Sequence, residues 1–354
     1  MKEILIVGGG IAGTCLARAL VDGGLEPARL RVLDAGCPRR GSAAPATMLH
    51  AFPGRSLAVR GFQQAAFVES FALMRRWQER YGGAWWREGA MARPFTEDEQ
   101  GQRLRTSWER WHGEYPAPLR SEVLSPREAR ARFEGLVVDD DVVVYEPAAG
   151  VLIPEWLRVM SEALRADGVT LEQGTWRRGQ APEGTTVVLA MGTGLIPCFP
   201  GLDLRRKAGE VLVLDPGGRE LPVFINGAGH LLQRPDGLWG LGSTYFPEEE
   251  WDARDDAAAT EELLRGVDQL FPAVRDARVL TLWRGERCLF GSDHRPLLGP
   301  VPGAAAHYVF GALGSKGLLW GPALARLLAA HLLDEAPIPG GLSTARVKAH
   351  RWGH

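Results

Sequence analysis

The sequence predicts an α/β protein whose second domain is an α+β unit with a discontinuous antiparallel sheet. Three observations predict it. A hydrophobic strand at residues 4–7 leads through a glycine-rich turn into a helical pattern, which is how a parallel βαβ unit begins. Between Lys207 and Trp283, alternating apolar and polar runs are separated by turn signals, as in antiparallel strands. The last section, 308–333, is again strand, loop and helix, so each domain is expected to be discontinuous.

The first domain opens with the strand at 4–7 and a helix that Gly23-Gly24 ends. A second strand, Leu30 to Leu33, leads to Asp34 and completes a βαβ opening. A glycine- and alanine-rich loop follows. The periodicity of Phe62 to Arg80 then predicts an amphipathic helix.

The middle of the chain is expected to leave the first domain and return to it. Residues 82–132 are rich in Trp, Arg and Glu, and Ser125 with Pro126 marks a helix start there. A helix at 154–166 and a buried strand at 185–190 belong to the first domain again. We therefore expect a first domain of residues 1–80, 146–205 and 284–345, and a second of residues 81–145 and 206–283.

The composition excludes several classes of protein. The 354 residues carry a net charge of -2, so the chain as a whole has no electrostatic bias toward nucleic acid or an anionic membrane. The longest apolar stretch, 317–333, is interrupted by Pro322 and Arg326 and is too short for a bilayer, so we interpret it as a core helix. The four cysteines lack the spacing of a disulfide framework or a zinc site, so we expect no metal. With no room for a signal peptide before residue 4, a reducing cytoplasm fits best.

The turn Gly8-x-Gly10-x-x-Gly13 has the spacing of a dinucleotide-binding fingerprint. The first glycine permits the tight turn, the second lets backbone approach a pyrophosphate, and the third lets helix and strand pack closely. The helix N-terminus adds amide donors and a positive dipole. Asp34 follows about 20 residues further on, where its carboxylate can accept hydrogen bonds from ribose hydroxyls. A glycine-rich turn that binds nothing is the alternative.

FAD is favoured over NAD as the dinucleotide. The fingerprint stands very early in the chain, and Val187–Gly194 is a second segment of the kind that flavoproteins place near FAD. No second fingerprint stands between a strand and a helix, so we expect no separate NADPH site. The electrons must then come from the organic substrate.

Blocks near the C-terminus carry a family resemblance. Residues 283–287 (Trp-x-Gly-x-Arg), 293–300 and 311–318 resemble the signature blocks of the D-amino-acid-oxidase family. That family includes glycine oxidase, sarcosine oxidase and the oxidase domain of a bifunctional enzyme that modifies the wobble uridine of tRNA, which is also similar at 41–50 and 240–245. The resemblance implies an FAD-binding Rossmann-type domain beside a discontinuous antiparallel-sheet substrate domain.

Together, the fingerprint and the resemblance predict which residues contact FAD. They come from the first turn, the end of the second strand and the loop after it, the segment after the 185–190 strand, and the C-terminal blocks. The predicted residues are Gly8, Gly10, Ile11, Ala12, Gly13, Asp34, Ala35, Gly41, Ser42, Ala43, Ala190, Gly192, Arg287, Gly314, Ser315, Lys316, Gly317 and Leu318. Because sarcosine oxidase attaches its flavin through a cysteine in this region, covalent attachment through Cys288 is a further hypothesis.

Arg287 is predicted to bind the substrate's carboxylate, because a guanidinium group matches a carboxylate in bidentate geometry. The matching residue of glycine-oxidase-like relatives has this role, and a structural salt bridge is the alternative. Lys316 stands in the loop before the last helix, where the tRNA enzyme is expected to have an arginine. A cation there would favour the anionic reduced flavin; a solvated surface lysine is the alternative.

His50 and Tyr245 complete the predicted catalytic residues. His50 lies in the loop after the second strand and would line the flavin or contact the substrate. Its alternative is a packed, hydrogen-bonded histidine. Tyr245 follows a strand with a glycine-rich end and would point into the substrate cavity, or else be a half-buried strand tyrosine.

Three functions compete. The first is oxidation of the C–N bond of a carboxylate-bearing amine, an amino acid or a secondary amine, by hydride transfer to flavin N5, imine hydrolysis and flavin reoxidation. No acid/base dyad is recognisable, which agrees with an amine that reacts in its neutral form. The second is removal of a carboxymethyl group from a tRNA wobble uridine, and the third is a non-catalytic flavin-binding sensor or assembly protein. A basic surface around the cavity mouth would favour tRNA; a closed pocket would favour a small-molecule amine.

Overall fold

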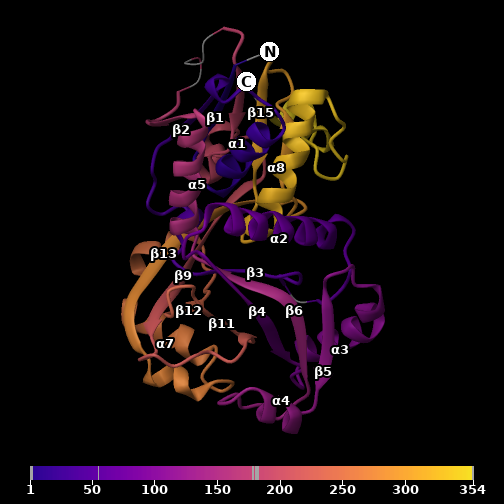
Figure 1. The fold of residues 1–354 in the computed structure, drawn as a ribbon, viewed down its shortest axis with the longest axis vertical. Helices are drawn as coiled ribbons and strands as arrows, with labels where there is room; N and C mark the ends of the chain where they lie inside the picture. Colours follow the sequence, from indigo (N-terminus) through magenta and orange to yellow (C-terminus); the bar gives the residue numbers. More distant parts are fainter. Residues whose placement is uncertain (1–2, 55, 178, 180–182, 353–354) are drawn as a thin grey trace.

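The computed structural model describes residues 3–54, 56–177, 179 and 183–352. Two sheets dominate it, one in the upper and one in the lower part of Figure 1. Helix α2 (Phe62–Tyr81) lies across the middle of this view, between the two. No helix of the described residues is both long and apolar enough to cross a membrane.

The upper sheet has six strands in the order β14-β15-β8-β1-β2-β7. Neighbours from β15 to β7 run parallel, and β14 is antiparallel to β15. The inner strands of this sheet are mostly apolar because both of its faces are covered. Their bounds are β1 (Ile4–Val7), β2 (Leu30–Asp34), β7 (Thr170–Gln173), β8 (Thr186–Leu189), β14 (Leu297–Pro300) and β15 (His307–Gly311).

Alternation along β1 divides the core of this sheet. Ile4 and Ile6 pack on the face that carries the helices, whereas Leu5 and Val7 pack on the opposite face with Trp352. The helices of the first face contact one another, α1 with α5 and α8, and α8 with α2. They are α1 (Ile11–Asp22), α5 (Ile153–Asp167) and α8 (Gly317–Asp334). The βαβ opening and the helices expected at 62–80, 154–166 and 317–333 are therefore confirmed.

The lower sheet has nine strands in the order β13-β9-β12-β11-β10-β4-β6-β3, with β5 also paired to β6. It is mainly antiparallel, as expected; of the pairs among the described strands, β10 with β4 is the parallel one. The bounds are β3 (Thr47–Leu49), β4 (Trp86–Pro94), β5 (Arg120–Leu124), β6 (Val142–Val151), β9 (Leu204–Asp215), β10 (Phe224–Asn226), β11 (His230–Gln233), β12 (Trp239–Gly242) and β13 (Arg278–Phe290).

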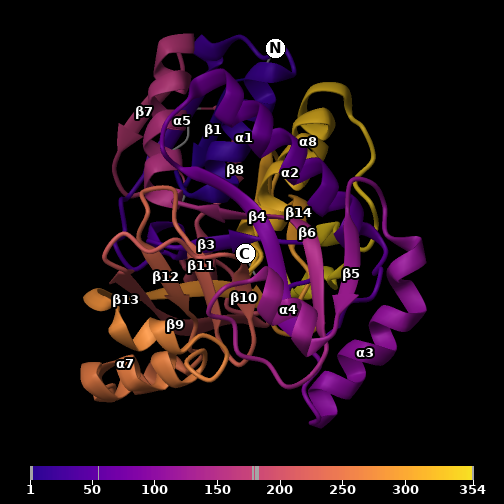
Figure 2. The same ribbon diagram turned by 60° about the horizontal axis from the view of Figure 1, so that its bottom comes forward.

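Further helices flank the lower sheet. Figure 2 shows α7 (Asp256–Arg265) beside β9 and β13, and α3 (Glu99–Trp111) beside β5. The predicted helix start at Ser125 is confirmed as the capping box of α4 (Pro126–Arg132). Strand β6 runs through residue 146 and β13 through residue 284, so these two expected domain boundaries fall inside strands of the lower sheet. The division into domains stays a prediction.

Candidate active site

A cavity of about 1020 Å³ lies between the two sheets. One end is formed at the carboxyl ends of β1, β2 and β8, where parallel sheets bind their ligands. The other end is formed by strands of the lower sheet, including β4, β11 and β13. The cavity is therefore large enough for a ligand that contacts both sheets.

The glycines of the first turn are packed too closely for any side chain. A Cβ on Gly8, whose φ is +110°, would lie 2.3 Å from the Ala190 carbonyl oxygen. A Cβ on Gly13 would lie 1.8 Å from the Gly8 carbonyl oxygen, and one on Gly10 would lie 2.8 Å from Ser42 Oγ. Each glycine thus has the steric reason that a dinucleotide fingerprint requires.

Polar groups are arranged for phosphate and ribose at the same end. Helix α1 begins after Gly10, which has no side chain to cap it, and Gly10, Ile11 and Ala12 at this helix start line the cavity. Ser42 Oγ accepts a hydrogen bond from the Ile11 amide at 3.1 Å. Asp34, at the end of β2, accepts one from the Gly9 amide at 3.1 Å and pairs with Arg40. Its carboxylate keeps lone pairs for ribose hydroxyls. These residues fit the ADP half of a dinucleotide.

Nearly all the residues predicted to contact the cofactor line the cavity. Gly13 and Ala43 do not. Gly13 instead packs helix α1 against the turn, which is the role of the third glycine. The wall also contains Gly174, Thr175 and Trp176, which follow β7 and carry no recognisable motif in the sequence.

The substrate end has a cationic wall. Arg60, Arg93, Arg287 and Lys316 all line it. The acidic residues on the cavity wall are Asp34, paired with Arg40, and Glu286, which pairs with Arg206 and accepts a hydrogen bond from Thr193. The cationic side chains of the substrate end therefore have no acidic partner on the cavity wall and can bind an anionic ligand.

Arg287 extends from β13 with its Cζ 4.4 Å from the centroid of the Tyr245 ring. Gly209 lies directly behind it, since a Cβ there would be 2.0 Å from Arg287 Nη2. Within the described part of the chain, no carboxylate lies at ion-pair distance from this guanidinium group. The structural salt bridge considered as its alternative role is absent there.

Tyr245 lies beside Arg287 on the cavity wall, and its side chain is 62% exposed. Partial desolvation raises the pKa of its phenol. The Arg287 guanidinium and hydrogen bonds with Ser243 and Ser315 outweigh that effect and lower the pKa below 10. The Tyr245 ring also makes a cation–π contact with the Arg287 guanidinium group, which helps to hold that group in place.

Two histidines of the substrate end are neutral at physiological pH. Burial, reinforced by the Arg93 charge, lowers the pKa of His50 to about 3. Burial and the Arg287 charge lower the pKa of His230 to about 4. His50 Nδ1 lies 3.0 Å from the Tyr145 hydroxyl, and His50 also lines the cavity. Both alternatives of the sequence analysis, a packed, hydrogen-bonded histidine and a cavity-lining one, therefore describe this residue.

Lys316 is the N-cap residue of α8 and is half-buried, not a solvated surface lysine. Its Nζ donates a hydrogen bond to Gln63 Oε1 at 3.2 Å. Burial, followed by the nearby Arg60 charge, lowers the pKa of this ammonium group. The four predicted catalytic residues are therefore brought to one cavity, and their roles stay predictions.

Comparison with known proteins identifies the family. The profile of the DAO family, described as FAD dependent oxidoreductase, matches residues 3–331. The chain belongs to this family. The predicted resemblance and the prediction of FAD as cofactor are confirmed.

Several relatives of this FAD-dependent oxidoreductase are known. The tRNA 5-methylaminomethyl-2-thiouridine biosynthesis bifunctional proteins MnmC of Caulobacter sp. (strain K31) and Marinobacter nauticus are 28% and 27% identical over 97% and 94% of this chain. The chain spans 56% of each of them. Glycine oxidase from Geobacillus kaustophilus superposes with a TM-score of 0.81 at 21% identity, covering 98% of this chain and 99% of that one. Iminodiacetate oxidase from Chelativorans sp. BNC1 gives 0.78 at 20%, covering 96% and 98%. These two structures share the fold.

Cys288 lines the cavity, but the residue is only 4% exposed. Burial raises the pKa of this thiol to about 12, and only a thiolate is a good nucleophile. The environment therefore favours non-covalent FAD over attachment through Cys288.

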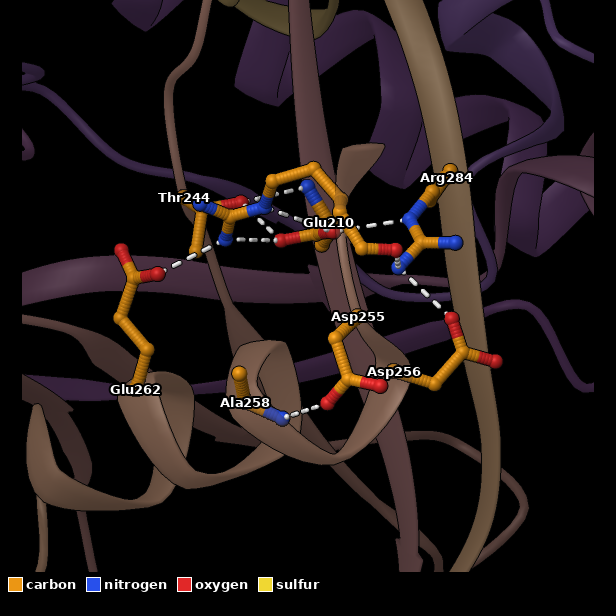
Figure 3. A network of polar contacts seen from close by, with 8 residues as sticks. Glu210, Thr244, Asp255, Asp256, Ala258, Glu262 and Arg284 are labelled. Carbon is orange, nitrogen blue, oxygen red and sulfur yellow. Dashed lines mark hydrogen bonds and ion pairs between the residues drawn. The ribbon is translucent and has the colours of Figure 1, made fainter. Parts of the chain in front are cut away.

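A buried ionic network is centred on Glu210 and includes Thr244 and Arg284 (Figure 3). The Glu210 carboxylate is fully buried on β9. It accepts hydrogen bonds from Thr244 Oγ1 at 2.8 Å, Arg254 Nη2 at 2.7 Å and Arg284 Nε at 2.8 Å. Because Thr244 precedes Tyr245, the network ties the segment after β12 to β9 and β13, and so fixes Tyr245 next to Arg287.

Sequence reasoning missed several residues of the substrate end, among them Arg93, His230 and Asn226. Each comes from a different strand of the lower sheet, and the order of the strands brings them together. One local signal was available: Arg93 is a charged residue flanked by Met91, Ala92 and Phe95, all of which are buried.

Proposed function

We propose that this FAD-dependent oxidoreductase oxidises the C–N bond of an amine that carries a carboxylate. The observation that carries the proposal is Arg287, a guanidinium group on the cavity wall with no carboxylate partner among the described residues. A substrate carboxylate would supply that partner in bidentate geometry. Bound FAD would provide the two-electron acceptor for the carbon next to the amine.

The surrounding side chains support an amine that reacts in its neutral form. His50 and His230 are uncharged, and no acidic residue of the described wall is left without a cationic partner. The cationic wall also disfavours a protonated amine through like-charge repulsion. Arg287 would hold the carboxylate, and Tyr245 would hold Arg287. Lys316 would place a positive charge at the start of α8, where the resemblance expects the flavin. Water then hydrolyses the imine to a carbonyl compound and a smaller amine.

The names of similar proteins support the same substrate class. Solved structures with this fold are titled glycine oxidase, iminodiacetate oxidase, L-amino acid deaminase and L-proline dehydrogenase. Glycine, iminodiacetate, proline and the L-amino acids are all carboxylate-bearing amines. These compounds differ in size and share the carboxylate and the amine, which supports the substrate class.

A tRNA wobble uridine is the second candidate substrate. It is supported by the bifunctional tRNA-biosynthesis proteins, which are similar to nearly the whole of this chain. The first candidate is preferred because the charged groups described above are on the wall of a cavity between the sheets, where a small amine fits.

Anaerobic mixing of the FAD-loaded protein with a panel of amines tests the proposal. The panel contains glycine, sarcosine, iminodiacetate, larger D- and L-amino acids, and tRNA lacking the final wobble modification. We expect at least one small carboxylate-bearing amine to bleach the flavin absorbance. Bleaching by the tRNA alone would transfer the proposal to the second candidate, and no bleaching by any of them would support a non-catalytic flavin protein.

A further inference from the structure

Arg93 is a buried cation that lacks a counter-charge. Its side chain is 3% exposed and lies on the wall of the same cavity as Arg287. It is hydrogen-bonded to Tyr145, but Nη1 has no hydrogen-bond partner among the described residues. An unpaired charge in the interior is strongly destabilising, because the lost hydration is not replaced.

The other buried arginines of the described chain are paired. Arg18, 2% exposed, contacts Asp22 and Asp167. Arg234, 8% exposed, pairs with Asp236. The protein thus supplies carboxylates to buried arginines elsewhere, and Arg93 differs in facing a ligand cavity. The missing partner of Arg93 is best provided by a ligand.

Arg93 and Arg287 occupy different places on the cavity wall. Arg93 is on β4 and Arg287 on β13, with β10, β11, β12 and β9 between these strands in the sheet. His230 on β11 and Asn226 on β10 line the cavity between them and are uncharged. One carboxylate carries a single negative charge, whereas the guanidinium groups of Arg93 and Arg287 together carry two positive charges. Two separate anionic groups are needed to neutralise both arginines.

We infer that the cavity contains a second anion-binding subsite for the distal carboxylate of the substrate, formed by Arg93 and Asn226 on the cavity wall, with the buried Tyr145 hydroxyl hydrogen-bonded to both behind them. The inference rests on the proposed function, because Arg287 is taken to hold the carboxylate nearest the reacting carbon. The substrate class narrows accordingly to amines with two carboxylates, such as N-(carboxyalkyl)amino acids. The uncharged side chains between the two arginines would contact the linking chain.

Paired substrates test this subsite in the FAD-loaded protein. Iminodiacetate, N-(2-carboxyethyl)glycine and N-(3-carboxypropyl)glycine each carry a distal carboxylate at a different length. N-ethylglycine, N-propylglycine and N-butylglycine carry a methyl group in its place. We expect the second-order rate constant of anaerobic flavin reduction to favour the carboxylate member of at least one pair by about thirtyfold or more, as for a buried charge pair. Arg93→Met should abolish that preference.

The matched control is Arg120→Met, on β5 of the same sheet, where the side chain is 77% exposed. It should keep the preference of the wild type. An equal preference in wild type and Arg93→Met would overturn the subsite. So would a wild type that favours the methyl member of every pair.

A binding measurement separates failure of the subsite from failure of the proposed function. Succinate, glutarate and adipate are compared with butyrate, valerate and hexanoate by thermal unfolding of the FAD-loaded protein. At least one dicarboxylate should raise Tm above its monocarboxylate counterpart in the wild type and not in Arg93→Met. The ligand-free variant should unfold at the same or a higher temperature than the wild type, because it has lost an unpaired buried charge. If a dicarboxylate raises the Tm of the wild type alone and no amine bleaches the flavin, the subsite is supported and the proposed oxidase function is rejected. Equal Tm increases in both proteins reject the subsite.

Discussion

The two ends of the cavity are built in different ways. The cofactor end depends mainly on backbone packing within a short part of the chain, from Gly8 to Ser42, to which the distant Ala190 carbonyl adds a close contact at Gly8. The substrate end depends on side chains that reach the cavity from strands far apart in sequence, such as Arg93 on β4 and Arg287 on β13. A local motif can be read from the sequence because its glycines are required by nearby backbone. A site that depends on the order of strands in a sheet cannot be read from the sequence in this way.

The two ends also differ in how their charges are balanced. At the cofactor end, Asp34 pairs with Arg40 and Glu286 with Arg206. At the substrate end, Arg93 and Arg287 have no carboxylate partner within the described chain. The first end offers amides and hydroxyls to a cofactor, whereas the second offers positive charge to an anion.

The largest expected effect tests the packing of the cofactor end. Gly13→Val would place a side chain 1.8 Å from the Gly8 carbonyl oxygen, which forces helix α1 away from the turn. We expect at least a thousandfold loss of FAD affinity, on the order of 4 kcal/mol. Bound FAD per purified chain measures it. Gly113→Ala is the control, since nothing lies within 4 Å of its added Cβ. Normal FAD content in Gly13→Val would show that the close packing is not required.

The next effect tests the Glu210 network, which holds the Tyr245 segment at the substrate end. Glu210→Ala leaves Arg254 and Arg284 without their buried partner. We expect the free energy of unfolding to fall by about 3 kcal/mol, measured by urea denaturation. The control Glu262→Ala removes a 53% exposed partner of the same Arg254 and should cost less than about 1 kcal/mol. Equal losses would mean that Glu210 has no special role in this network.

A smaller effect is expected for the ribose contact of the cofactor end. Asp34→Ala removes a charged acceptor and should weaken FAD binding by about 1–3 kcal/mol. Titration of the apoprotein with FAD, followed by flavin fluorescence, measures the change. Unchanged affinity would remove Asp34 from the site.

The smallest effect is a pH dependence of stability at the substrate end. The folded protein holds the pKa of His230 at about 4, whereas an unfolded histidine titrates near 6.5. As pH falls below 6.5, the unfolded chain binds a proton that the folded chain does not, so the free energy of unfolding decreases. His230→Gln should reduce that slope by about 1 kcal/mol per pH unit near pH 5.5. The exposed His350→Gln should leave the slope unchanged. Parallel curves for all three proteins would contradict a neutral His230.

Sequence reasoning reached most of the fold and part of the site. The βαβ opening and the helices α2, α5 and α8 could be predicted because periodicity and glycine turns are local signals. Arg287, Lys316, His50 and Tyr245 were found through family blocks, and the structure brings them to one cavity. Arg93 and His230 were missed because their positions follow from the order of the lower sheet, where β10 joins β4 in parallel. The order of strands has no local signature.

Arg287 gives the most direct test of the account. The rate of anaerobic flavin reduction at limiting substrate is compared for wild type, Arg287→Met and Arg287→Lys, with matched amines that have or lack a carboxylate. We expect Arg287→Met to keep its flavin and to lose about 2–5 kcal/mol of transition-state binding, a thirtyfold to several-thousandfold fall in the second-order rate constant of flavin reduction, only with the carboxylate-bearing amines. Arg287→Lys should recover part of the loss, because an ammonium group cannot form the bidentate contact. Equal rates in wild type and Arg287→Met with every carboxylate-bearing amine would contradict the proposed substrate class.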